Sequence, residues 1–533
     1  MLRRYNFLLP LGFAVALFFG FRIGLLVAPN GDKPSLFGKN QLSRMDEVLQ
    51  YVRDNYVDTV NTDNMQNKGI IEMLSTLDPH SSFIPVSRTA AADDELNGNF
   101  QGIGLQFLIV EDTVFVVEVI KGGPSEKSGI VAGDRIISAN DETIAGKKMK
   151  SADIQKKLKG VGGSKVKLGI LHSGNHEVKF VTITRGVVPV NSVDAHYMID
   201  KEIGYIKFAR FSGSSYEEFK SALDGLMKQG MKKLILDLRG NGGGLLDQAT
   251  DIIDEMLEQS KLMVYTEGRT STRQDYKTRF EGSFEMQPLA VLIDEGSASA
   301  SEIVAGALQD WDRAEIIGRR SFGKGLVQQP FNLSDGSELR LTIAKYYTPS
   351  GRCIQKPYEK SLFDYYDEVY MRGNSGELYS ADSIHINDTT RYFTAGNRVV
   401  YGGGGIIPDV FVPKDSVKMN AFIKEVLDKN LAEQFVYLQF GRMIPVKKYA
   451  SLNELLADNL INDEVYKAFI IYCKSKGLEA TQYNVTSAAR NYLVAQMNLF
   501  LAQIELGSNS FYELQNRIDK TMLKAVDEMK KKK

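Results

Sequence analysis

The chain has 533 residues, too many for one ordinary hydrophobic core, and its 43% hydrophobic and 25% charged residues are typical of several globular domains. Its 65 basic and 66 acidic residues leave a formal net charge of −1, which excludes a global electrostatic attraction to nucleic acid. Its two cysteines make no disulfide framework, and without CxxC or HExxH patterns the sequence gives no indication of a metal site.

The N-terminal segment has the pattern of an export signal. Arg3 and Arg4 precede an apolar stretch from Phe7 to Val27, and a basic head before such a stretch is typical of a signal peptide or signal anchor. No clear small-x-small cleavage site follows, which favours a retained anchor in residues 1–28. Because the arginines lie on the starting side, the rest of the chain should lie outside the cytoplasm. We therefore expect a protein of the cell envelope or periplasm, anchored to the inner membrane.

Residues 38–97 are predicted to be a helical region. Between Leu42 and Leu77 apolar residues recur at helix-face spacing, among them Met45, Val48, Leu49 and Val52. The pattern stops at Leu77-Asp78-Pro79-His80, because proline cannot continue a helix. This spacing favours a packing or dimerisation element, so a homo-oligomer held by the helical flanks is expected.

Residues 98–186 are predicted to form a small β-rich domain. Its expected elements are a serine-capped helix and four strands, over Ser151–Leu158, Ile103–Val110, Thr113–Ile120, Lys165–Leu171 and His176–Thr184. A further strand begins after Gly133. The short Glu111-Asp112 turn should join the first two strands.

From residue 187 to residue 412, strands and helices alternate, which indicates an α/β layer structure. The expected strands are Ile203–Phe211, Lys233–Leu238 and Leu289–Ile293. The expected helices are Leu246–Leu257 and Ala300–Gln309. A polar, aromatic insertion spans residues 355–398. Residues 413–533 are mostly helical by pattern and carry no chemical motif.

The segment from Asp294 to Ile303 is the first candidate for chemistry. An apolar strand ends there in a turn of small residues that leads into a helix. Small side chains let a substrate carbonyl approach, and free N–H groups at a helix N-terminus can stabilise an oxyanion. The alternative is that the serines of this turn only cap the helix.

The second candidate segment runs from Ser321 to Gln329 and contains Lys324 between two glycines. Such a lysine is commonly a solvated loop residue. If its amine were buried beside a hydroxyl, desolvation would lower its pKa from the reference value of about 10.4, and the neutral amine could take a serine proton without a histidine.

The third candidate is the glycine-rich loop from Asp237 to Gly244, directly after a strand. Its backbone N–H groups could form an oxyanion hole. A glycine-rich loop could also hold a phosphate, but the chain has neither the G-x-x-x-x-G-K-[ST] nor the G-x-G-x-x-G pattern here, so a nucleotide site is weakly supported.

Together these segments resemble the carboxyl-terminal processing peptidases, also called tail-specific proteases. The matching motifs lie at residues 237–244, 296–303 and 323–328, with further matches at 77–81, 347–352 and 405–409. The resemblance runs from roughly residue 40 to residue 412, and the ordered combination of motifs is specific.

The resemblance implies roles for individual residues. It places the nucleophile on Ser299, the general base on Lys324 and the glutamine that orients the lysine on Gln328. The oxyanion hole would consist of the backbone N–H groups of Ala300 and of Gly243 or Gly244. The implied reaction is peptide hydrolysis through an acyl-enzyme, with no metal or other cofactor.

The resemblance also implies an architecture. The core should be an α/β fold of the crotonase-like ββα-spiral type, with a β-rich PDZ domain inserted at 98–186 and helical regions at both ends. The PDZ loop that holds a substrate carboxylate falls on Gly102, Ile103, Gly104 and Leu105, and substrates would be polypeptides with a free C-terminus. A purely structural β-domain is the alternative.

Two other functions remain open from the sequence. One is a catalytically inactive PDZ scaffold, which the presence of Ser299, Lys324 and Gln328 disfavours. The other is a crotonase-like acyl-CoA enzyme that uses the glycine loop as its oxyanion hole, which export to a compartment without CoA disfavours.

Overall fold

The computed structural model describes residues 43–172, 174–359, 361–414, 421–441, 449–480, 483 and 485–532. The chain divides into two compact units, Met1–Ile70 and Ile71–Lys533. The predicted signal segment, residues 1–28, lies outside the described residues. Among those that are described, no helix has both the length and the apolar character needed to cross a membrane.

The predicted helical stretch from Leu42 to Leu77 contains two helices in place of one continuous helix. Helix α2 spans Arg44–Asn55 and helix α3 spans Thr62–Ser75. Helix α2 ends before Tyr56, where the backbone adopts an extended conformation with ψ 145°. Helix α3 begins after Asn61, whose side chain accepts a hydrogen bond from the Asn64 N–H at 2.9 Å. A polar side chain that accepts a hydrogen bond from a free N–H in the first turn is a helix N-cap, so Asn61 marks the start of a new helix.

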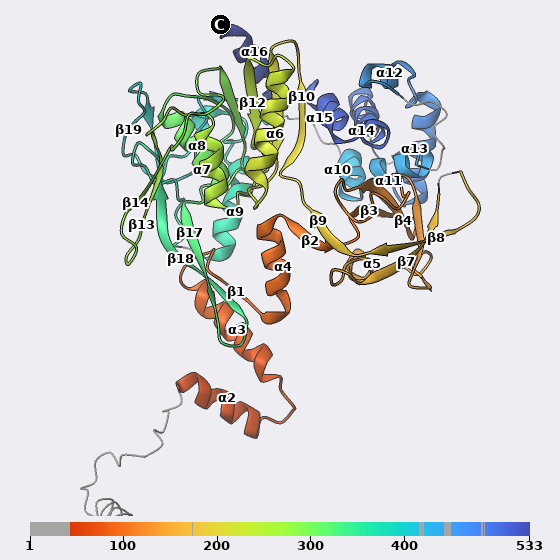
Figure 1. Cartoon of the computed structure of the whole chain (residues 1–533), viewed down its shortest axis with the longest axis horizontal. Helices are drawn as coiled ribbons and strands as arrows, with labels where there is room; N and C mark the ends of the chain where they lie inside the picture. The colour runs from red at the N-terminus through yellow and green to blue at the C-terminus, as the bar shows by residue number, and fades with distance from the viewer. Residues whose placement is uncertain are drawn as a thin grey trace, which may run out of the picture. The chain divides into compact units, whose positions relative to one another are not determined.

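The β-rich domain is an antiparallel sheet in the order β3-β4-β5-β7-β8, with β6 paired to β5. Figure 1 shows this sheet together with its helix α5. Its elements are β3 (Leu105–Val110), β4 (Thr113–Val119), β5 (Arg135–Ala139), β6 (Glu142–Thr143), α5 (Ser151–Leu158), β7 (Lys165–Leu171) and β8 (Lys179–Thr184). Glu111 and Asp112 both have positive φ, at 47° and 58°, as a tight hairpin turn requires.

Short elements lead into and out of this domain. Strand β2 (Asn99–Gly102) pairs with β9 (Gly186–Pro189), so the chain enters and leaves the domain side by side. Before them lie β1 (Ser82–Ile84) and α4 (Val86–Asn97). This pairing explains how the domain is inserted without separating the flanking parts of the core.

The central sheet of the core has the order β10-β11-β12-β15-β16-β21. Only β10 runs antiparallel to its neighbour, and the others are parallel. The strands are β10 (Val193–Met198), β11 (Ile203–Phe208), β12 (Lys233–Asp237), β15 (Leu289–Ile293), β16 (Glu315–Gly318) and β21 (Val410–Phe411). Their near-continuous apolar runs are typical of parallel strands covered on both faces.

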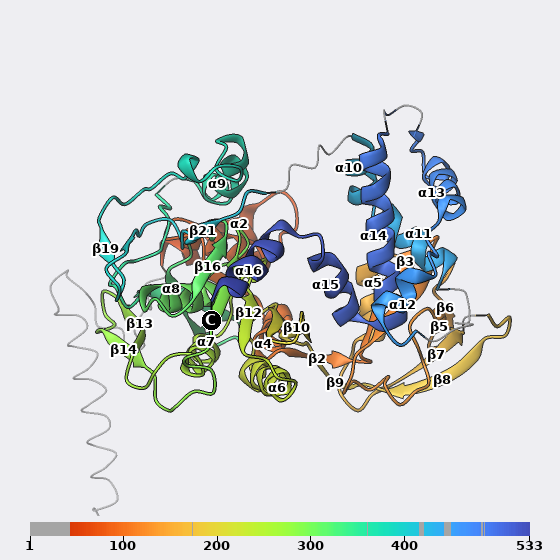
Figure 2. The same cartoon turned by 90° about the horizontal axis from the view of Figure 1, so that it is seen from above.

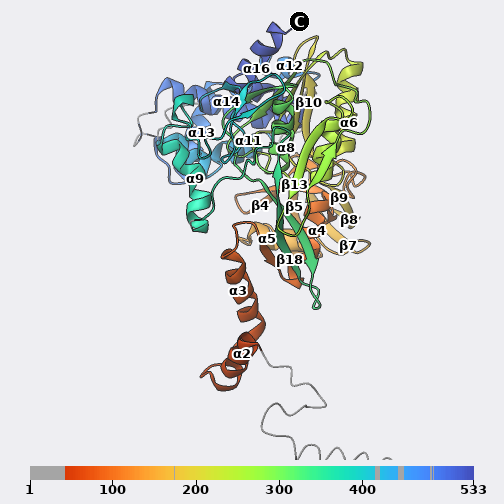
Figure 3. The same cartoon turned by 90° about the vertical axis from the view of Figure 1, so that its left-hand side faces the viewer.

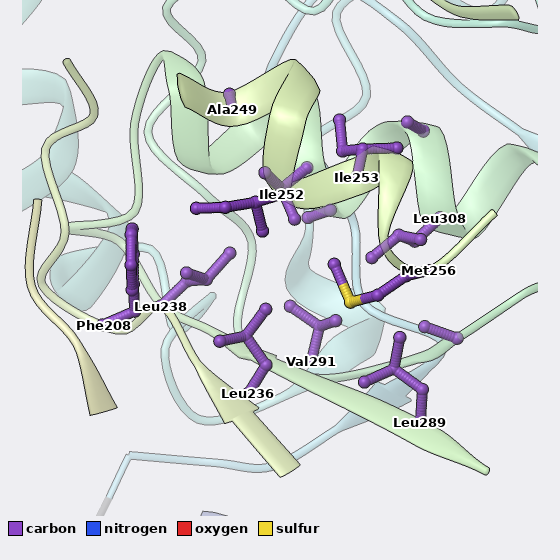
Figure 4. Close-up of a cluster of buried hydrophobic side chains, with 14 of the residues drawn as sticks. Phe208, Leu236, Leu238, Ala249, Ile252, Ile253, Met256, Leu289, Val291 and Leu308 are labelled. Atoms are coloured by element: carbon purple, nitrogen blue, oxygen red, sulfur yellow. The ribbon is translucent and has the colours of Figure 1, made fainter. Parts of the chain in front are cut away.

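Helices cover both faces of this sheet. On one face lie α6 (Ser215–Lys228), α7 (Leu246–Asp254) and α8 (Ala300–Asp310). Figure 4 shows Ile252 of α7, and Met256 just after this helix, packed over Leu236 and Val291 of the strands. On the other face, helix α16 (Lys520–Lys531) buries Met522, Ala525 and Met529 against the strands. Burial of this apolar surface stabilises the sheet that carries the candidate site.

A second, antiparallel sheet has the order β1-β18-β13-β14, with β17 also paired to β18. Its strands are β13 (Leu262–Glu267), β14 (Gln274–Lys277), β17 (Leu326–Asn332) and β18 (Glu338–Tyr347). The long strand β18 is visible in Figure 3. Because β17 begins immediately after Gly325, this sheet holds one end of the lysine segment.

The insertion at 355–398 contains a helix that the sequence pattern did not indicate. Helix α9 spans Leu362–Asn374 and is capped by Ser361, whose side chain accepts a hydrogen bond from the Asp364 N–H. The remaining elements are short: a 3₁₀ turn at Ala381–Ser383 and strands β19 (Tyr392–Phe393) and β20 (Val399–Val400).

The C-terminal region is helical, as the sequence predicted. Figure 2 shows the long helix α14 (Ser487–Leu506) with the other helices around it. These are α10 (Ala421–Asp428), α11 (Leu431–Gln439), α12 (Leu452–Ala457), α13 (Asp463–Ser475) and α15 (Ser508–Asn516). They share a hydrophobic cluster that includes Phe435, Phe469 and Leu493.

Candidate active site

Sheet topology brings the three candidate segments together. Strands β12, β15 and β16 are adjacent and parallel, so their carboxyl ends lie at one edge of the sheet. The glycine loop follows β12, the serine turn follows β15 and the lysine loop follows β16. In open α/β sheets this edge is where ligands bind.

Ser299 stands at the end of the turn after β15, immediately before helix α8. Its φ of 56° is a left-handed value that is strained for a residue with a side chain. The neighbouring serines are engaged elsewhere, because Ser297 Oγ donates to Leu238 O at 2.8 Å. Ser301 Oγ donates to Asn241 O at 2.9 Å. Within the described residues, Ser299 is thus the serine of this turn whose hydroxyl no main-chain carbonyl holds.

The glycine loop lies against this serine. A Cβ on Gly243, which has φ 96°, would come within 2.6 Å of Ser299 Cβ and 2.9 Å of Ala300 N, so only glycine fits there. Gly244 instead packs on Phe211, whose carbonyl oxygen would lie 1.9 Å from a Cβ. Of the two predicted glycines, Gly243 is the one beside Ser299.

The backbone N–H groups of this region differ in their availability. The Ala300 N–H opens helix α8 and has no acceptor in the described part of the chain, which suits an oxyanion donor. The Gly243 N–H donates to Asn241 Oδ1 at 2.9 Å. If Gly243 contributes to an oxyanion hole, this hydrogen bond must be shared or broken.

Glu302 joins the serine turn to the lysine loop. Its buried Oε2 accepts hydrogen bonds from the N–H of Ser299 at 2.9 Å and from the N–H of Lys324 at 2.8 Å. Its Oε1 accepts from the Gly323 N–H at 2.7 Å and from the Ser321 hydroxyl. Burial raises the pKa of Glu302, and these four hydrogen bonds oppose that shift. One carboxylate therefore fixes the spacing of the two predicted catalytic segments.

Glu302 was missed by reasoning from the sequence. The available signal was its position three residues after Ser299 in the first turn of a helix, where an acidic side chain commonly accepts from the capping backbone. The additional contacts to Gly323 and Lys324 arise only from the fold.

The amine of Lys324 has no hydrogen-bond or ion-pair partner among the described residues. Burial lowers the pKa of Lys324 below its usual value, and the negative charges of Glu302 and Asp78 oppose the shift. A lower pKa increases the neutral fraction of the amine, which is the form that can accept a proton.

Tyr346 holds the lysine segment. Its hydroxyl donates to the backbone oxygen of Lys324. Burial, followed by the charge of Glu302, raises the pKa of Tyr346 well above its usual value, so the phenol stays neutral. This residue too was absent from the sequence predictions.

Asp78 and His80 interact electrostatically with Lys324. The backbone N–H of His80 donates to Asp78 Oδ1 at 2.8 Å, and the ring Nε2 of His80 is 2.9 Å from the Tyr365 hydroxyl. Burial, and then the charge of Lys324, lower the pKa of His80 to about 4. An imidazole with so low a pKa is a weak base, which leaves Lys324 as the stronger candidate.

Gln328 does not contact the lysine amine in the described residues. Its Nε2 donates to Thr342 Oγ1 at 3.4 Å, and Thr342 Oγ1 donates to Asp78 Oδ1 at 3.0 Å. Gln328 therefore reaches the surroundings of Lys324 through Thr342 and Asp78, and its role in orienting the lysine stays a prediction.

The β-rich domain carries a separate groove. It has a volume of about 320 Å³ and lies between the loop Ile103–Leu105 and the end of helix α5, at Leu158 and Lys159. Gly104 has φ 77° and lies so close to Gly123 that a Cβ would come within 3.1 Å of its Cα. The groove thus borders the loop predicted to bind a carboxylate.

Replacing Glu302 by glutamine should impair both activity and stability. The amide would place an NH₂ group among N–H donors, leaving buried groups unpaired at a cost of about 2–4 kcal/mol in the free energy of unfolding, and kcat should fall about 100-fold as the two segments separate. Peptide hydrolysis and chemical denaturation measure the two effects. Glu281→Gln, at an exposed position, is the matched control; wild-type kinetics for Glu302→Gln would rule out the linking role.

Comparison with known proteins gave consistent matches. Residues 202–359 match peptidase family S41, and residues 115–171 match the PDZ domain. The carboxy-terminal-processing protease of Bartonella bacilliformis is 36% identical over 323 residues, which cover 59% of this chain and 73% of that protein. The carboxy-terminal processing protease CtpA of Bacillus subtilis is 32% identical over 359 residues, which cover 65% of this chain and 76% of the relative. A solved structure, the photosystem II D1 C-terminal processing protease, aligns over 69% of this chain and 88% of its own, with 27% identity and a TM-score of 0.34.

Proposed function

The chain belongs to the carboxy-terminal processing serine proteases of peptidase family S41, and on that premise we propose that it is an exported endopeptidase that acts through a Ser299–Lys324 dyad. The observation that carries this proposal is the shared carboxylate of Glu302, which binds the N–H groups of Ser299 and Lys324 while the lysine amine stays unpaired in the described residues.

The first half of the reaction forms an acyl-enzyme. Neutral Lys324 Nζ takes the proton of Ser299 Oγ as that oxygen attacks the carbonyl carbon of the peptide bond. The oxyanion that develops is stabilised by the Ala300 N–H and by an N–H of the glycine loop. The Lys324 ammonium then gives its proton to the leaving amine, the C–N bond breaks, and an ester of Ser299 remains.

The second half repeats the same proton transfers with water. Lys324, neutral again, takes a proton from a water molecule as the water oxygen attacks the ester carbonyl. Collapse of the second tetrahedral intermediate breaks the bond to Ser299 Oγ, which recovers a proton from Lys324. No group outside the chain is needed to balance protons or electrons.

The PDZ domain is proposed to select substrates by their C-terminal tails. PDZ domains bind peptide C-termini by adding a strand to a sheet edge while backbone N–H groups hold the carboxylate. The groove beside Gly104 is bordered by apolar side chains, including Phe100, Phe107 and Leu158. We therefore propose substrates with a free carboxylate and an apolar last residue.

Export is proposed from the basic head and apolar stretch of residues 1–28. The protease would then act in the cell envelope or periplasm, held at the inner membrane. Cell fractionation tests this location, and recovery of the whole chain in the cytoplasm would exclude it. Oligomerisation through the helical flanks stays a prediction.

Amidation of a peptide's C-terminus should weaken its binding to the full-length Ser299→Ala protein at least about tenfold, because the PDZ loop loses a charged acceptor. Fluorescence anisotropy with a matched pair of peptides, free acid and amide, measures this. Acetylating the N-terminus instead should leave the affinity unchanged. Equal affinity for acid and amide would exclude carboxylate recognition.

A further inference from the structure

The loop that carries Lys324 is held far more tightly than its two glycines suggest. From Ser321 to Gly325, every backbone N–H and C=O is hydrogen-bonded. The Phe322 N–H, for example, donates to Ser297 O at 2.9 Å, and the Gly325 N–H donates to Gln355 Oε1 at 2.8 Å. Only the Lys324 side chain of this loop points to no partner in the described residues.

Helix α9 of the 355–398 insertion supplies two of these hydrogen bonds through one side chain. Arg372 is 2% exposed, and its Nη1 donates to Ser321 O at 2.7 Å while its Nη2 donates to Phe322 O at 3.1 Å. A guanidinium is planar and presents its donors in a fixed fork, so this pair of contacts fixes the orientation of two successive peptide groups. Both peptide groups lie directly before the Gly323-Lys324 pair.

Arg372 is itself fixed by Glu368, one turn earlier on α9. The Nε and Nη2 of Arg372 each donate to a different Glu368 oxygen, both at 2.9 Å, and Glu368 also accepts from Lys356 Nζ at 2.9 Å. Burial by itself would raise the pKa of Glu368, but the hydrogen bonds and charges of Arg372 and Lys356 hold it at about 2. The carboxylate is therefore charged near neutral pH.

Helix α9 also contacts the ring of Phe322, two residues before Lys324. The Tyr365 ring packs edge-on against Phe322, with centroids 5.8 Å apart. Lys356 Nζ lies 4.1 Å from the Phe322 ring centroid and 4.4 Å from that of Tyr365. These contacts pack the insertion against the lysine loop on the side that faces α9.

We propose that helix α9 is part of the active site, and that Arg372, braced by Glu368, is a positioning residue that presents the Lys324 amine to Ser299. The proposal rests on the Ser299–Lys324 dyad proposed above. It assigns a role to an insertion that carries no recognisable motif of its own.

Loosening this brace has a predictable consequence for the base. If the peptide groups of Ser321 and Phe322 lose their donors, the loop can rotate and water can reach the Lys324 amine. Hydration favours the charged form, so the pKa of Lys324 should rise toward its usual value. The charged and titratable groups that face the amine, Glu302, Asp78 and His80, are unchanged by substitutions at Arg372.

The test compares Arg372→Lys and Arg372→Met with the wild type by the rate at which a serine-reactive phosphonate labels Ser299, measured against pH. We expect the midpoint of the rising limb to move up by about one pH unit in Arg372→Lys and further in Arg372→Met, with labelling about tenfold slower below the midpoint. Arg391→Met removes an exposed arginine of the same insertion and should leave the profile unchanged.

A purely structural role for Arg372 would lower the amplitude of labelling without moving its pH midpoint, and that result would overturn the proposal. Should Arg372→Met fail to fold by circular dichroism, Arg372→Lys decides alone, because it keeps the charge but not the planar fork of donors. Ser299→Ala and Lys324→Met are measured in parallel. Normal labelling of either one would refute the dyad itself, which is a different outcome from an unshifted profile at Arg372.

Discussion

Replacing Ser299 by alanine is expected to lower kcat for peptide hydrolysis by at least about 10⁴-fold and to abolish labelling by a serine-reactive phosphonate. The substitution removes the oxygen that forms the acyl-enzyme, while the backbone contact to Glu302 is kept, because it is made by the Ser299 N–H. Cleavage of an unstructured protein such as casein, followed by peptide mapping of the labelled wild type, measures both effects.

Ser301→Ala is the matched control for this prediction. Its hydroxyl donates to the Asn241 carbonyl oxygen and makes no other hydrogen bond within the described residues, so its loss should reduce thermal stability slightly and leave labelling intact. Casein cleavage that survives Ser299→Ala, or a label that maps to Ser297 or Ser301, would move the nucleophile to another residue.

Replacing Lys324 by methionine is expected to lower kcat by about 10³-fold while the fold is retained. Methionine keeps a straight side chain of similar length but cannot accept a proton, and a general base contributes about 10²–10⁴-fold. Because every backbone group of Ser321–Gly325 is bound by other residues, the loop does not depend on the lysine side chain. Steady-state kinetics and circular dichroism separate loss of the base from loss of the fold.

The wild type provides the corresponding pH signature. Lys324 must be neutral to act, so activity should rise about tenfold per pH unit below its pKa and level off above it. Since burial lowers that pKa, the plateau should begin below the value of about 10.4 usual for lysine. Lys277→Met, an exposed lysine, is the control. A Lys324→Met variant whose activity still rises with pH as in the wild type would show that another group is the base.

The backbone strain at Ser299 is consistent with its proposed role as the nucleophile. A residue with a side chain held at positive φ costs about 1–3 kcal/mol and persists only where its surroundings determine it. Here Glu302 holds the Ser299 N–H, and Gly243 packs closely against the serine. The strain is consistent with a turn shaped to expose one hydroxyl.

Sequence patterns did not predict some of the helices and strand boundaries, and the physical reasons can be named. Helix α9 buries Tyr365 and Arg372 instead of an apolar stripe, so its apolar residues do not mark the face that packs on the core. The predicted helical stretch 42–77 contains a break because Tyr56 turns extended, a backbone choice that apolar spacing does not encode. Strand β8 begins at Lys179, three residues later than the predicted His176.

The sequence by itself determined the family, the α/β class of the core, the β-rich domain and the three segments that hold the candidate chemistry, because these depend on local motifs and on the order of strands and helices. Only the tertiary structure decided which side chains join those segments. Glu302, Tyr346 and Arg372 act across loops through hydrogen bonds to backbone groups, and any residue type can supply the backbone group. Such contacts leave no mark on the sequence of the loop they hold, so they become visible only when the chain is folded.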